Sequence, residues 1–119
     1  MFKMKNLILF LVIVFTFLIS NVKAQDQISS KDAKDYIGQT LQVKGLVAAI
    51  FISDKGNVFI NFDEKSPKQT FTVAVFAGKD IDISKIIEGC TLTVYGEIKE
   101  YKGKPEIVID KNEQIISIE

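Results

Sequence analysis

The chain has 119 residues, with 15 lysines balanced by 15 aspartates and glutamates, and it contains neither histidine nor arginine. The absence of histidine excludes a serine–histidine triad, a histidine general base and a histidine metal site. The absence of arginine removes the side chain best suited to bidentate phosphate contacts. We therefore expect a protein that is not an enzyme and that holds no metal or cofactor.

Residues 1–24 have the three parts of a secretory signal peptide. Lys3 and Lys5 precede an apolar run over Leu7–Phe15, and Val22–Ala24 places small or aliphatic residues at −3 and −1 of a cleavage point. Because a membrane span needs about 20 apolar residues, we expect cleavage, and an uncleaved membrane anchor is the alternative. We predict export to the periplasm or the extracellular space, with no stable membrane anchor after cleavage.

Residues 25–119 then form one domain, which is long enough for a single core. Three of the 15 lysines belong to the leader, so the mature domain has 12 lysines against 15 carboxylates and a net charge of −3. Cys90 is the only cysteine, which excludes an intrachain disulfide. We expect Cys90 to be a half-buried core residue without further assigned role, and we expect a monomer.

The first element predicted after the leader is a short helix. Ser29 or Ser30 is its N-cap, and Asp32 completes a Ser-x-x-Asp capping pattern. The helix runs over Ala33–Ile37 and stops at Gly38, because glycine commonly follows the last helical residue.

Alternation of apolar and polar residues predicts five strands in the rest of the domain. They cover residues 41–51, 58–62, 71–76, 91–99 and 105–110. Gly45 predicts a bulge or bend in the first strand, and Asp82 caps a second helix over Ile83–Glu88, where isoleucines recur at spacings of three and four. Gln114–Ile118 is expected to pack back on the sheet. The order predicts an all-β fold, the five-stranded Greek-key OB barrel, rather than a sandwich of about seven strands.

Several segments of the domain stand in an order that is typical of one protein family. They are Tyr36–Thr40, Val43–Val47, Phe59–Phe62, Phe71–Val73 and Val94–Ile98, followed by Glu100–Ile107. The chain resembles the OB-fold domains of the tRNA-anticodon-binding-like group, in a small exported bacterial form, over nearly the whole mature domain. This resemblance implies that the protein binds single-stranded DNA or RNA, with Phe59 at the position of a base-stacking residue.

The alternation also predicts which side chains face a ligand. OB folds bind oligonucleotides over their second and third strands and the adjoining loops, where aromatic rings stack on bases and lysines follow the phosphates. Inward positions are Ile60, Phe62, Phe71, Val73 and Val75. The predicted ligand contacts are Phe59, Asn61, Thr72, Phe76 and Tyr101 for the bases, and Lys55, Lys102 and Lys104 for the phosphates.

Charge limits the strength of this predicted binding. A net charge of −3 without arginine neutralises few phosphates, and Asp63 and Glu64 end the second strand and would repel them. We therefore expect weak, salt-sensitive binding. The alternative is an envelope protein- or glycan-binding OB module with no nucleic-acid activity, which an even scatter of lysines would favour. Clustering of Lys55, Lys68 and the two hairpin lysines around one aromatic face would favour nucleic acid.

Overall fold

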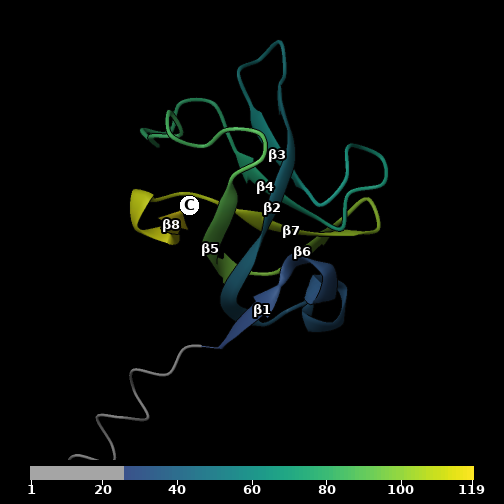
Figure 1. Ribbon diagram of the computed structural model, residues 1–119. Coiled ribbons are helices and arrows are strands. Elements are labelled where there is room, and N and C mark those ends of the chain that lie inside the picture. The colour runs from purple at the N-terminus through teal and green to yellow at the C-terminus, as the bar shows by residue number, and fades with distance from the viewer. Residues whose placement is uncertain (1–25) are drawn as a thin grey trace, which may run out of the picture.

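The computed structural model describes residues 26–119, so the predicted signal peptide and its cleavage site lie outside the described residues. This part consists of strands and two short 3-10 helices (Figure 1). The elements are β1 (Gln27–Ser29), η1 (Ser30–Tyr36), β2 (Thr40–Ile52), β3 (Val58–Phe62), β4 (Phe71–Val75), β5 (Thr91–Glu97), β6 (Lys99–Tyr101), β7 (Lys104–Val108), η2 (Asn112–Gln114) and β8 (Ile115–Ile118). No helix within residues 26–119 is long and apolar enough to cross a membrane.

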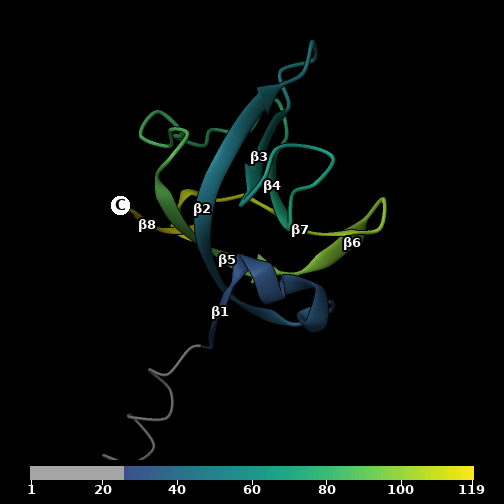
Figure 2. The same ribbon diagram turned by 45° about the vertical axis from the view of Figure 1, so that its right-hand side comes forward.

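The strands follow the hydrogen-bonded order β6-β7-β4-β3-β2-β5-β8, and β1 pairs with β2. The long β2 organises this sheet, because its first half pairs with β5 and its second half with β3. Figure 2 shows β2 as a curved strand that runs across the molecule. β7 runs parallel to β4, and only Ile98 separates β5 from β6. The ladders form an open path between β6 and β8, so closure into a barrel stays a prediction.

Gly45 lies in β2 for a different reason from the predicted bulge. The register of β2 against β3 shifts between Val47 and Ala49, which places the irregularity further along the strand. A Cβ atom at Gly45 would lie 2.0 Å from the Oγ atom of Ser30 and 2.9 Å from a ring carbon of Phe62. Glycine is therefore needed where η1 packs directly on the strand.

The core lies between the two halves of the curved sheet. Phe62 and Phe71 meet edge to face, with ring centroids 5.0 Å apart, and both are fully buried. The predicted inward positions of β3 and β4 are all buried, as is Cys90, which packs as a small apolar side chain. The inward half of the predicted alternation is thus confirmed, but the predicted outward positions Asn61, Thr72 and Ala74 are buried as well.

Several predicted boundaries need correction. The segment predicted as one strand from 91 to 99 is two strands, β5 and β6, and the tail that was expected only to pack on the sheet forms β8 and pairs with β5. The N-terminal helix is a 3-10 helix capped by Ser29, whose Oγ accepts from the backbone N–H of Lys31 rather than from that of Asp32.

The second predicted helix, over Ile83–Glu88, is wrong, because this segment is an irregular loop. The carboxylate of Asp82 accepts hydrogen bonds from the backbone N–H and the hydroxyl of Ser84, which forms a tight turn instead of a helix start. Ile86 is buried whereas Ile87 is 62% exposed. The isoleucine spacing therefore reflects a loop that inserts Ile86 into the core and packs Ile83 against it.

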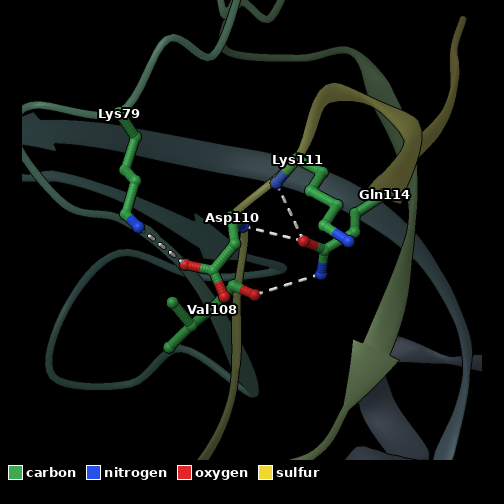
Figure 3. Close-up of polar contacts among 5 residues, drawn as sticks. All are labelled: Lys79, Val108, Asp110, Lys111 and Gln114. Carbon is green, nitrogen blue, oxygen red and sulfur yellow. Dashed lines mark hydrogen bonds and ion pairs between the residues drawn. The ribbon is translucent and has the colours of Figure 1, made fainter.

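Gln114 explains why the C-terminal segment returns to the sheet (Figure 3). Its Oε1 atom accepts hydrogen bonds from the backbone N–H groups of Asp110 (2.7 Å) and Lys111 (3.0 Å). Its Nε2 atom donates to the backbone carbonyls of Val108 (3.2 Å) and Tyr95 (3.0 Å). One side chain thus joins the end of β7, the turn after it and β5.

Candidate nucleic-acid interface

An open groove of about 740 Å³ lies over β3 and β4. The end of β2 forms one wall, and the other walls are loop 63–70, which joins β3 to β4, and the β6–β7 hairpin. Figures 1 and 2 both show the loop and the hairpin on the same side of the sheet. Six predicted contacts line the groove: Phe59, Asn61, Thr72, Tyr101, Lys102 and Lys104.

Two predicted contacts lie elsewhere. Phe76 follows the end of β4 and is 43% exposed, but it does not line the groove. Lys55 belongs to the turn between β2 and β3 and is also absent from the lining, as is Lys68. The predicted lysine cluster is therefore only partly present, and Lys65 takes a place in the groove that we had not assigned to it.

Aromatic rings form two opposite parts of the groove. Phe51 is the register partner of Phe59, and their rings stack with centroids 6.4 Å apart and planes inclined by 23°. Tyr101 stands on the hairpin, and Phe51 and Tyr101 are 59% and 54% exposed. We did not predict Phe51, because its pairing with Phe59 depends on the register shift between Val47 and Ala49.

The hairpin holds Tyr101 and Lys102 at its tip. Lys102 and Gly103 have positive φ angles of 50° and 79°, which are the backbone conformations that a two-residue hairpin turn requires. The Nζ atom of Lys102 lies 5.4 Å from the centroid of the Tyr101 ring, within cation–π range. The tip therefore presents an aromatic face and a cation together.

The floor of the groove is polar. Asn61, Thr72 and Glu106 are register neighbours on β3, β4 and β7, and all three are nearly buried. The hydroxyl of Thr72 donates to Oδ1 of Asn61 over 3.1 Å. Nε2 of Gln69 lies 3.5 Å from the same hydroxyl, whereas Oε1 of Gln69 is buried and has no hydrogen-bond partner within residues 26–119.

Glu106 adds a carboxyl group to this floor. It is 8% exposed, and burial raises its pKa above the ordinary value, an effect that the charge of Lys99 opposes. Sequence reasoning missed Glu106, because a glutamate in an alternating strand usually indicates a solvent-facing position. Only the parallel pairing of β7 with β4 brings it beside Thr72.

Asp63 uses its carboxylate within the fold, and the repulsion of phosphate predicted for it stays a prediction. It accepts hydrogen bonds from the hydroxyls of Ser30 (2.7 Å) and Thr70. Asp63 does not line the groove. Across residues 26–119, no three acidic or cysteine side chains gather as metal ligands would.

No protein-family model matches the chain, and no curated protein matches its sequence. A solved structure of a protein from Leishmania major Friedlin, named as an aspartyl-tRNA synthetase, is similar with a TM-score of 0.54 and 10% identity. That match covers 75% of this chain and 20% of the synthetase chain, so this chain spans about one fifth of that protein's length. The fold is OB-like. A second structure, from Klebsiella pneumoniae subsp. pneumoniae MGH 78578 and named as a nucleic acid-binding lipoprotein, has a TM-score of 0.47 and 15% identity, over 75% of this chain and 92% of that one.

Proposed function

We propose that this chain is an exported, non-catalytic OB-fold module that binds single-stranded nucleic acid or short oligonucleotides in the groove. The proposal depends chiefly on the aromatic arrangement, in which the stacked Phe51–Phe59 pair and Tyr101 stand in different walls of one groove. We also propose that the sheet closes as a five-stranded barrel. The pairing of β6 with β7, directly after β5, supports this closure.

Base stacking supplies most of the proposed affinity. Stacking of one base on an aromatic side chain contributes about 1–3 kcal/mol and tolerates any base, since every base has a π face. Phe51 and Tyr101 are both more than half exposed, so their rings are accessible to bases in an extended strand. Sequence-tolerant binding is therefore expected.

Polar groups at the floor add a preference for ligands with N–H donors. Within the described residues, Oε1 of Gln69 is a buried acceptor without a partner, and the carboxyl group of Glu106 lies at the same floor. A buried acceptor left without a donor costs about 1–3 kcal/mol. The N–H groups on a base edge would satisfy these acceptors.

Few cations accompany these groups. Lys65, Lys102 and Lys104 line the groove, while the domain as a whole carries three more carboxylates than lysines. Because release of counterions scales with the number of neutralised phosphates, we propose an affinity that falls with salt along a shallow slope.

Fluorescence anisotropy with labelled single-stranded DNA and RNA tests the proposal. The exported protein should bind saturably at low salt and, more weakly, at about 0.15 M salt. Phe59→Ala should weaken binding by about 5- to 150-fold, which corresponds to the loss of about 1–3 kcal/mol of stacking. Phe76→Ala is the matched control, because this phenylalanine is exposed outside the groove. Absence of saturable binding at both salts would contradict the proposal.

One observation favours the alternative, an envelope protein- or glycan-binding module. An ionised Glu106 at the floor repels phosphate but accepts hydrogen bonds from sugar hydroxyls, and aromatic rings beside it suit a sugar ring. Titration with neutral oligosaccharides, followed by NMR shifts of groove amides, separates the two functions. Shifts with oligosaccharide and none with oligonucleotide would select the glycan.

Export is proposed from residues 1–24, and its test is independent of binding. Mass spectrometry of the protein recovered outside the cytoplasm should show a mature N-terminus at Gln25. Retention of residues 1–24 on the recovered protein would overturn cleavage.

A further inference from the structure

Loop 63–70 is anchored firmly at its two ends. The carboxylate of Asp63 accepts hydrogen bonds from the hydroxyls of Ser30 and Thr70. The backbone N–H of Asp63 also donates to the carbonyl of Leu46 (2.8 Å). The backbone N–H of Thr70 donates to the carbonyl of Phe62 (3.2 Å). These contacts fix where the loop leaves β3 and enters β4, but none of them reaches the hairpin across the groove.

One side chain makes that connection. Lys104, the first residue of β7, donates from Nζ to the backbone carbonyl of Gln69 over 3.0 Å. No other side-chain hydrogen bond within residues 26–119 joins the hairpin to loop 63–70. The two groups are 35 positions apart in the sequence, and their bond joins the loop to the hairpin beyond the first pair of the β4–β7 ladder, Thr72 and Glu106.

The three groove lysines are therefore not equivalent. Lys102 is exposed at the hairpin tip over the Tyr101 ring, and Lys65 is exposed on the loop. Lys104 is half-buried, and its ammonium group is directed to a backbone carbonyl. A lysine held in this way is less available to phosphate than one at the tip.

We infer that Lys104 is a positioning residue, which acts on the ligand through loop 63–70 and not by contacting phosphate. This inference rests on the proposed function of the groove. By holding the Gln69 carbonyl, Lys104 keeps the buried Oε1 of the same residue at the floor and keeps Lys65 at the rim. This positioning role replaces the phosphate contact that the sequence predicts for Lys104.

Salt dependence of binding distinguishes a positioning residue from a phosphate contact. In anisotropy titrations with single-stranded DNA from low to 0.2 M salt, Lys102→Met should lower the slope of log K against log salt by about one. Lys104→Met should weaken binding by about 3- to 10-fold at every salt with the slope unchanged. Lys104→Arg, which keeps a donor at this position, should restore affinity. A fall in slope for Lys104→Met equal to that of Lys102→Met would overturn the inference.

A second measurement needs no nucleic acid. Hydrogen exchange of the backbone amides of Lys68 and Thr70, which donate to the carbonyls of Lys65 and Phe62, should accelerate several-fold in Lys104→Met, remain unchanged in Lys102→Met and return towards the wild-type rate in Lys104→Arg. Thermal unfolding confirms that each variant is folded. If the wild type bound no nucleic acid, the proposed function would fail, but the exchange result would still test whether Lys104 holds loop 63–70. Unchanged exchange in Lys104→Met would overturn the positioning role of Lys104 and leave the proposed function of the groove untouched.

Discussion

Loop 63–70 and the longer loop 76–90 adjoin opposite ends of β4. They differ in whether their polar groups find hydrogen-bond partners within the protein. Loop 76–90 contributes Ile81, Ile83 and Ile86 to the core or its edge. Loop 63–70 contributes no apolar side chain to that core, but it lines the groove with Lys65 and Gln69, among others. One loop completes the hydrophobic interior, and the other borders an open surface.

The polar contacts of loop 76–90 are satisfied within the protein. Oδ1 of Asn112 accepts from the backbone N–H of Asp82 (2.8 Å), and its Nδ2 donates to the carbonyl of Asp80 (3.0 Å). Lys79 forms an ion pair of 3.6 Å with Asp110 (Figure 3). In loop 63–70, by contrast, Oε1 of Gln69 is buried without a partner.

Whether a loop's buried polar groups are satisfied distinguishes a structural loop from a candidate ligand-binding loop better than the exposure of its side chains does. Folded proteins satisfy nearly all their buried polar groups, so a loop that satisfies its own groups serves the fold. A loop that leaves an acceptor buried and unpaired at a groove suggests a donor supplied by a ligand. Three changes of sequence can break or sharpen this comparison.

The largest effect is expected in loop 76–90. Ile86→Ala should lower the free energy of unfolding by about 2–4 kcal/mol, because it leaves a cavity under the sheet. Urea denaturation measures this loss. Ile87→Ala, one residue along and largely exposed, should change stability by no more than about 0.5 kcal/mol. Equal losses of stability for the two variants would show that the loop does not pack as described. The oligonucleotide affinity of folded Ile86→Ala should match that of the wild type.

Gln69→Leu should have the opposite profile. Removal of an unpaired buried acceptor should leave the free energy of unfolding unchanged or higher. Oligonucleotide affinity should fall by about 2- to 10-fold, the equivalent of one net hydrogen bond. Anisotropy and urea denaturation on the same preparation test both parts. Gln39→Leu is the control, since Gln39 is exposed and outside the groove, and a loss of stability in Gln69→Leu without a loss of affinity would contradict the assignment.

The smallest effect concerns Glu106 and depends on pH. Burial raises the pKa of this carboxyl in the folded protein, so the folded state binds its proton more tightly than the unfolded state does. The resulting cost is absent below the ordinary pKa of about 4.5 and grows as pH rises through the raised value. Glu106→Gln should therefore raise the melting temperature at pH 7 slightly and by less at pH 4. Circular dichroism measures both, and Glu100→Gln, on an exposed position of β6, should show no such difference.

Prediction of the strands succeeded where side-chain alternation is strict. The range Val58–Phe62 was predicted with its observed bounds, and the same alternation directed Phe59, Asn61 and Thr72 to the groove. Asn61 and Thr72 lie deeper than expected, because the loop and the hairpin rise on either side of them. That these residues bind a ligand stays a prediction.

The failed helix prediction has a physical cause. Isoleucines at spacings of three and four favour a helix only when one continuous face is buried, but Ile86 packs into the core while its neighbour Ile87 remains in solvent. Gly78 and Gly89, at the ends of this segment, both have positive φ angles, which glycine adopts readily. The loop therefore completes the core without regular structure.

The sequence alone determined β3 and β4, the phase of the face that they turn to the groove and its aromatic character, because alternation is a local property of neighbouring side chains. Tertiary structure decided which distant groups meet. It placed Phe51 beside Phe59, Glu106 beside Thr72 and the ammonium of Lys104 on the carbonyl of Gln69. These contacts depend on the register between strands and on the register shift in β2, which are set by packing over the whole sheet and leave no local signal in the chain.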